Sequence, residues 1–190
     1  MEDDLVLQQL IASAQVLGIQ NDPSLPADDR QILRVADQEK RALSAREVRQ
    51  LCRTSTCDAQ LIEHLQNQAN HLVQQARELL IREQPHLVET GGALFPSERA
   101  DACWRDCWNF LRVTLYALAC RRTTFTNPEG MLCLRALYTH LGVPLDGLNI
   151  ALKELKTLSI LEVTNPVDAQ LLHDTFSHLL DELNKTAIKT

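Results

Sequence analysis

The stretch from Glu98 to Arg121, ERADACWRDCWNFLRVTLYALACR, decides the fold. Its leucines Leu111, Leu115 and Leu118 recur at spacings of four and three residues, which places them on one face of an α-helix. Neighbouring apolar side chains widen this face. We therefore expect one long central helix over residues 98–121 that packs its apolar face into a core.

The same helical spacing of apolar residues runs through almost the whole chain, and no run alternates with period two for long enough to predict a sheet. Prolines and glycines fall at or near the edges of the periodic segments, where they mark helix ends. The other expected helices cover residues 3–17, 28–41, 45–54, 58–84, 129–141, 145–161 and 167–186. The sequence therefore predicts an all-α protein.

Side chains suited to helix N-caps stand at the start of three of these segments. Ser44 and Glu47 have the spacing of a capping box, in which each side chain bonds the backbone N–H of the other residue. Asp58 and Ser97 are residue types that accept from the first backbone N–H groups of a helix. We expect Ser44, Asp58 and Ser97 to cap the helices that they precede.

The overall composition excludes several classes of protein. The chain has 190 residues, a net charge of −6 and no basic stripe, which argues against nucleic acid as a partner. It contains no apolar run long enough to span a membrane, and its first residues are acidic where a signal peptide is basic. We therefore expect a soluble, cytoplasmic protein. Its six cysteines include no C-x-x-C pair, so they are expected to be reduced thiols and not zinc ligands.

A thiol, a guanidinium and a carboxylate lie close together at the start of the central helix, in Cys103, Arg105 and Asp106. Helical spacing places Arg99, Cys103 and Asp106 on one face and points Arg105 elsewhere, although its long stem can curl back. Such a set suits an extended, acidic, nitrogen-rich ligand that is held covalently. A buried thiol beside a solvated, ion-paired helix face is the alternative interpretation of the same residues.

The tetrapeptide Cys103-x-Arg105-Asp106 is common by itself, but together with short sequence blocks on either side of it the pattern becomes specific. From Ala76 to Leu161 the chain resembles the phycobiliproteins, the bilin-carrying globin-like subunits of cyanobacterial antennae. The matching blocks are Glu83-Gln84-Pro85, Gly91-Gly92, Cys103-x-Arg105-Asp106, Leu111-Arg112 and Leu134-Arg135-x-x-Tyr138. The resemblance implies a globin-like, bilin-binding domain over 44–190, preceded by an extra N-terminal helical extension over 1–43.

The resemblance also implies a role for each residue of the cluster. Cys103 would form a thioether with an open-chain tetrapyrrole of the phycocyanobilin type, and Asp106 would accept hydrogen bonds from its central pyrrole N–H groups. Arg105 and Arg99 would pair with its two propionates, and Tyr138 would lie near the far pyrroles. The expected cofactor-binding residues are therefore Arg99, Cys103, Trp104, Arg105, Asp106 and Tyr138.

The first 75 residues match the family poorly, and this leaves the biological setting open. The family uses its leading helices to form a heterodimer, so ordinary antenna assembly is in doubt. One version is a minor light-harvesting subunit docked in the phycobilisome at the thylakoid surface. The version we favour is a paralogue outside the antenna that carries bilin or serves pigment biosynthesis, pigment turnover or photosystem assembly. A protein partner is expected in either version, as a second copy, a phycobiliprotein-like subunit or an assembly partner.

Two other functions compete with bilin binding. A chromophore-free interaction protein that kept the globin scaffold would leave Cys103 buried and unreactive. A haem globin would need a histidine facing its pocket, and His140 lies in a suitable helix but aligns with a non-ligand position. No nucleophile–base pair, phosphate loop or metal-ligand spacing is visible, so we expect a protein that is not an enzyme.

Overall fold

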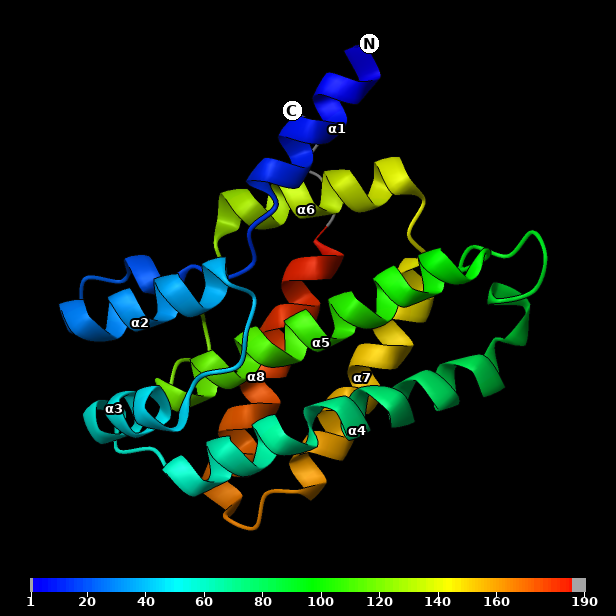
Figure 1. The fold of residues 1–190 in the computed structure, drawn as a ribbon. Helices are drawn as coiled ribbons and strands as arrows, with labels where there is room; N and C mark the ends of the chain where they lie inside the picture. The colour runs from blue at the N-terminus through cyan, green and yellow to red at the C-terminus, as the bar shows by residue number, and fades with distance from the viewer. Residues whose placement is uncertain (1, 186–190) are drawn as a thin grey trace.

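The computed structural model describes residues 2–185 and confirms the all-α prediction (Figure 1). Within that range the chain forms eight α-helices and two short 3-10 turns, one at Ile19–Asn21 and one at Pro85–Leu87. The helices are α1 (Glu2–Ser13), α2 (Ala27–Gln38), α3 (Ala45–Ser55), α4 (Ala59–Glu83), α5 (Ser97–Ala119), α6 (Pro128–Leu141), α7 (Leu145–Leu161) and α8 (Pro166–Asn184). Each corresponds to one expected segment, and residue 186 of the last prediction lies outside the described residues.

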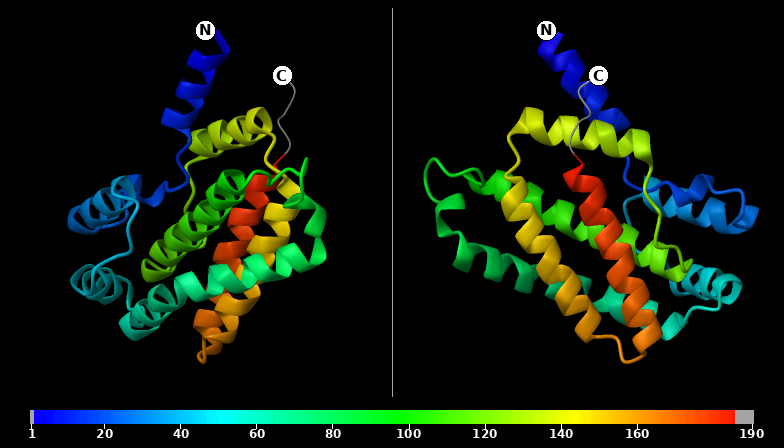
Figure 2. Two further views of the ribbon diagram at one scale, coloured as in Figure 1. Left: turned by 45° about the vertical axis from the view of Figure 1, so that its right-hand side comes forward. Right: turned by 180° about the vertical axis from the view of Figure 1, so that it is seen from behind.

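Helix α5 runs through the centre of the molecule and contacts α4, α7 and α8 (Figure 2). The leucine stripe predicted for it is fully packed, since Leu111, Leu115 and Leu118 are each at most 1% exposed. Leu33 and Ala36 of α2 belong to the same apolar core. The expected domain boundary at 43/44 stays a prediction, while the N-terminal segment shares its core with the rest of the chain.

The first expected helix ends earlier than its periodicity predicts. Helix α1 stops at Ser13, and the next residues run extended to Leu17, which forms an isolated antiparallel bridge with Thr126. The following residue must be small, because a Cβ on Gly18 would lie 2.5 Å from the Thr126 carbonyl oxygen. Pairing with a distant segment therefore overrides the local helical pattern, and α1 packs on α6 (Figure 1).

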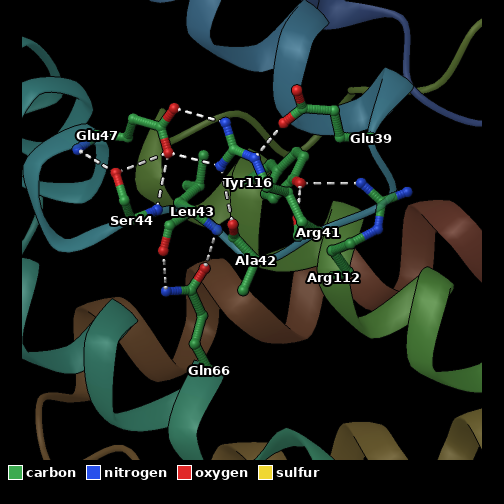
Figure 3. A network of polar contacts seen from close by, with 9 residues as sticks. All are labelled: Glu39, Arg41, Ala42, Leu43, Ser44, Glu47, Gln66, Arg112 and Tyr116. Carbon is green, nitrogen blue, oxygen red and sulfur yellow. Dashed lines mark hydrogen bonds and ion pairs between the residues drawn. The ribbon is translucent and has the colours of Figure 1, made fainter.

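Two of the three expected caps are present and the third is not. Ser44 and Glu47 form a complete capping box, and the Asp58 side chain accepts from the Gln60 N–H at 2.9 Å (Figure 3 shows the former). The prediction for Ser97 was wrong, because Ser97 is the first residue of α5 and its hydroxyl contacts Glu98 instead. Pro96 occupies the cap position, where its side chain has no acceptor.

A buried ion pair joins α2 to the central helix. The Arg112 guanidinium donates from Nη2 to Asp37 Oδ1 at 2.8 Å, and the two side chains are 3% and 6% exposed. Arg112 also donates to the Tyr116 hydroxyl, which in turn donates to the Arg41 carbonyl oxygen (Figure 3). Removing one member of such a pair leaves the other charge buried without compensation.

We expect Asp37→Ala to lower the free energy of unfolding by about 3–5 kcal/mol, because it leaves the Arg112 guanidinium unpaired inside the protein. Equilibrium urea unfolding measures this loss. Asp181→Ala is the matched control on an exposed position of α8 and should change stability by no more than about 0.5 kcal/mol. Equal effects of the two substitutions would show that the buried pair is unimportant.

Candidate functional site

A cavity of about 460 Å³ lies where α1, α5 and α6 meet the loops that precede α5 and α7. Its volume falls within the usual range for small-molecule sites. We call it the main cavity. Most of its wall is hydrocarbon, contributed by Leu94, Leu134, Leu137, Leu141, Val143 and Leu148. An apolar wall with a few polar groups is the ordinary composition of a site for an organic ligand.

Five of the six predicted cofactor-binding residues line the main cavity: Arg99, Cys103, Arg105, Asp106 and Tyr138. Trp104 does not. It is buried beside the cavity residues, with the Arg77 guanidinium stacked 5.5 Å from its ring centroid. Its indole N–H has no hydrogen-bond partner among the described residues. The structure thus gathers a thiol, a carboxylate, a phenol and two guanidinium groups around one space.

Helical spacing predicts that Arg105 points away from the face of α5 that carries Arg99, Cys103 and Asp106. Arg105 nevertheless lines the main cavity, because the cavity extends beyond that face. Ala102, one turn before Arg105, also lines the main cavity. The opening therefore extends to the side of α5 on which both residues lie. The Arg105 charge also reaches Asp106, where it lowers the carboxyl pKa.

Asp106 is the polar centre of the site. The Tyr138 hydroxyl donates to its Oδ2 at 2.9 Å, and Oδ1 has no hydrogen-bond partner among the described residues. Burial is the largest influence on Asp106 and raises the pKa of its carboxyl, against the opposing effects of Tyr138 and Arg105. A ligand that donates N–H groups to this carboxylate would replace part of the hydration lost on burial.

Two thiols stand one helical turn apart, and their roles differ. The neighbouring Cys107 side chain lowers the pKa of the Cys103 thiol, while Cys103 and burial raise the pKa of Cys107. Cys103 lines the main cavity, whereas Cys107 is only 1% exposed and does not. Because the thiolate is the nucleophilic form, Cys103 is the cysteine presented for reaction.

Arg99 is held at the rim of the main cavity by backbone carbonyls. Its Nε donates to Ala93 at 2.9 Å and its Nη2 donates to the Leu141 oxygen at 2.9 Å, at the C-terminal end of α6. Gly142, in the left-handed conformation with φ of 63°, ends this helix. Nη1 makes no hydrogen bond with the described residues, so this guanidinium is positioned while two of its N–H groups stay available.

Sequence patterns missed the contribution of the N-terminal segment to the cavity. Ile11 of α1 and Ala14 line it, although they precede the rest of the site by about eighty residues. Neither residue carries a chemical signal, and only the packing of α1 on α6 brings them there. No histidine lines the main cavity. In the described part of the chain, no cluster of three or more potential ligands could hold a metal ion, and no helix is long and apolar enough to cross a bilayer.

Comparison with known proteins relates most of the chain to one family. A sequence model described as phycobilisome protein matches residues 31–183. The chain is 29% identical over 127 residues to allophycocyanin subunit beta-18 of Porphyra purpurea, which covers 66% of this chain and 75% of the relative. It is 32% identical over 123 residues to the C-phycocyanin beta chain of Aglaothamnion neglectum, covering 65% and 70% of the two chains.

A solved structure shows the same fold. It is a far-red fluorescent biliprotein derived from a far-red induced allophycocyanin F subunit of Chroococcidiopsis thermalis. The TM-score is 0.60 at 23% identity, over 67% of this chain and 96% of the other. The globin-like arrangement expected from the sequence is therefore confirmed.

The thiol pair leads to a prediction about reactivity. In the ligand-free protein, iodoacetamide at about pH 7.5 should modify Cys103 faster than Cys107, because Cys103 holds more thiolate and reaches the cavity. Peptide mass spectrometry measures both rates. Cys107→Ala removes the neighbouring thiol and should move the pH profile of Cys103 alkylation to higher pH. Faster labelling of Cys107 would contradict the assignment.

Burial of Asp106 leads to a prediction about pH. Its folded-state pKa lies above the unfolded one, so wild-type protein loses stability as the pH rises through the folded pKa. Asp106→Asn carries no such charge. Its free energy of unfolding relative to wild type should therefore increase between about pH 4 and about pH 7. Urea unfolding of the ligand-free proteins at both pH values measures this, and a constant difference would refute it.

Proposed function

Because the chain belongs to the phycobilisome protein family, we propose that it holds an open-chain tetrapyrrole, a bilin, in the main cavity. The observation that carries the proposal is the convergence of Arg99, Cys103, Arg105 and Asp106 on this one apolar space. Related chains are named allophycocyanin and phycocyanin, and a structural neighbour is a fluorescent biliprotein. These likenesses support the ligand class.

The donors and acceptors of the site fit the chemistry of a bilin. Its ring faces and alkyl substituents suit the leucine-rich wall, and its pyrrole N–H groups suit the Asp106 carboxylate, whose Oδ1 has no protein partner among the described residues. Its two carboxylates suit Arg99 and Arg105, since charge-assisted pairs with guanidinium groups are short and directional. When bound, the bilin supplies the conjugated system that absorbs visible light, and the protein supplies orientation and electrostatics.

Cys103 is the proposed point of covalent attachment. Its thiol would add across a carbon–carbon double bond of a bilin side chain, which forms a carbon–sulfur bond and passes the thiol proton to the former alkene. Such an addition would need no oxidant or reductant. Lowering of the Cys103 pKa by Cys107 favours this addition, because thiolate is the attacking form.

We place this bilin protein outside the regular antenna, as a carrier or an assistant of assembly at the thylakoid surface. The residues that precede the family match at residue 31 are engaged within the chain itself, since Ile11 and Ala14 line the main cavity. Sedimentation with isolated phycobilisomes tests this setting, and stoichiometric co-sedimentation would refute it. A protein partner is then sought by cross-linking in the unsedimented fraction.

Co-expression with bilin-synthesis enzymes tests the ligand and the attachment. Denaturing electrophoresis with zinc-enhanced fluorescence should show a band that Cys103→Ala abolishes and Cys107→Ala retains, since only Cys103 lines the cavity. Pigment that binds in the native protein but is lost on denaturation would refute the thioether and retain the bilin site. Native protein without visible absorbance would favour a chromophore-free interaction protein, and a Soret band would indicate haem.

A further inference from the structure

A second cavity of about 150 Å³ adjoins the main cavity at Asp106, and we call it the side cavity. Ala14, Asp106, Leu134 and Tyr138 line both cavities. The two cavities are therefore neighbours on either side of these residues, which include the hydrogen-bonded pair of Tyr138 and Asp106. A protein cavity of roughly this volume binds benzene, so the side cavity has room for one five-membered ring.

Helix α5 arranges the residues of the two cavities in linear order. Cys103 lines only the main cavity, Asp106 lines both, and Asn109 and Val113 line only the side cavity. At a rise of 1.5 Å per residue, Cys103 and Asn109 are about 9 Å apart along the helix axis. An elongated ligand that is attached at Cys103 and passes Asp106 is thereby directed toward the side cavity.

Two cationic side chains line the side cavity, and they differ in how many hydrogen bonds they make within the protein. Arg112 donates to Asp37, Asn109 and Tyr116, which occupy all three of its nitrogens. Lys40 has one hydrogen-bond partner among the described residues, Asp37, at a long distance of 3.5 Å. That same carboxylate oxygen already accepts from Arg112 at 2.8 Å.

The position of Lys40 at the end of α2 makes it an accessible donor. Its side chain is 58% exposed, and its backbone has a φ of 51°, in the left-handed region directly after the helix. An ammonium group carries three donors, and Asp37 takes at most one of them here. The side cavity thus combines space for a ring with a cation whose N–H groups can serve a ligand oxygen.

We propose that the side cavity holds the terminal ring of the tetrapyrrole farther from Cys103, and that Lys40 donates a hydrogen bond to the carbonyl oxygen of that ring. This inference rests on the proposed bilin function and adds a subsite and a specificity-determining residue to it. The ligand class that the subsite accepts is a tetrapyrrole ending in a lactam ring. The N-terminal extension then contributes directly to the pigment's colour.

A positive charge beside a terminal carbonyl stabilises the electron density that light excitation moves onto its oxygen. Removing the Lys40 charge should therefore shift the long-wavelength absorption maximum of the bound pigment to shorter wavelength. The thioether at Cys103 lies in the other cavity and should be unaffected. Absorption colour and covalent pigment content thus separate the role of Lys40 from that of the attachment site.

The full chain loaded with phycocyanobilin is the protein to test, as wild type, Lys40→Gln, Lys40→Arg and Lys153→Gln. Lys153 is an exposed lysine of α7 that lines neither cavity and serves as the matched control. Zinc fluorescence after denaturing electrophoresis measures attachment, absorption spectra measure colour, and thermal unfolding verifies that each variant folds.

The proposal expects K40Q to retain wild-type pigment content with a maximum at shorter wavelength, while K40R and K153Q keep the wild-type maximum. A loaded K40Q protein with a spectrum that superimposes on wild type would overturn the subsite and leave the proposed function intact. An equal blue shift in K153Q would overturn it as well, because the effect would then be a general one of charge. Wild-type protein without pigment would instead refute the bilin function, and the subsite with it.

Discussion

The buried pair of Asp37 and Arg112 is the interaction on which the arrangement of the N-terminal half depends. Two charges in a water-poor core are costly unless they satisfy each other, so the pair holds the end of α2 beside α5. Tyr116 extends the network to the Arg41 carbonyl, and the Arg41 guanidinium bonds Glu47 in the capping box of α3 (Figure 3). A continuous chain of hydrogen bonds thus links the buried ion pair to the start of α3.

This constraint reaches the candidate site through the end of α2. Asp37 lines the side cavity and holds Lys40 next to it. On the other side, the Leu17–Thr126 bridge fixes where the chain leaves α1, and Ala14 then lines both cavities. The N-terminal segment therefore forms part of the wall of a site whose thiol, carboxylate and phenol lie on α5 and α6.

Asp106 is an example of a site residue that lowers the stability of the ligand-free fold. Burial raises the pKa of its carboxyl, and Tyr138 is its only hydrogen-bond partner among the described residues. A carboxylate kept short of donors is unfavourable for the ligand-free fold and favourable for binding N–H groups. The neighbouring Cys107 side chain likewise lowers the pKa of the Cys103 thiol, which favours the thiolate inside an apolar wall. These polar groups therefore suit ligand binding better than they suit the stability of the ligand-free protein.

Local patterns were sufficient for the helices, because periodicity and cap chemistry depend on neighbours a few residues away. The central helix with its leucine stripe, the capping box at Ser44 and the residues of the Cys103 cluster were all visible in this way. The errors arose where distant segments meet. Helix α1 stops at Ser13 because Leu17 pairs with Thr126, and Ser97 begins α5 without capping it.

The order of residues along the chain was enough to specify eight helices and to place a thiol, a carboxylate and two arginines on one of them. Tertiary packing alone decided that Tyr138 reaches Asp106 and that Arg105 borders the same space. It also brought Ile11 and Ala14 to the wall of the main cavity and Lys40 to the wall of the side cavity. The physical reason is range. Helical register is set by hydrogen bonds four residues apart, whereas a cavity is bounded by whichever surfaces the buried core brings together.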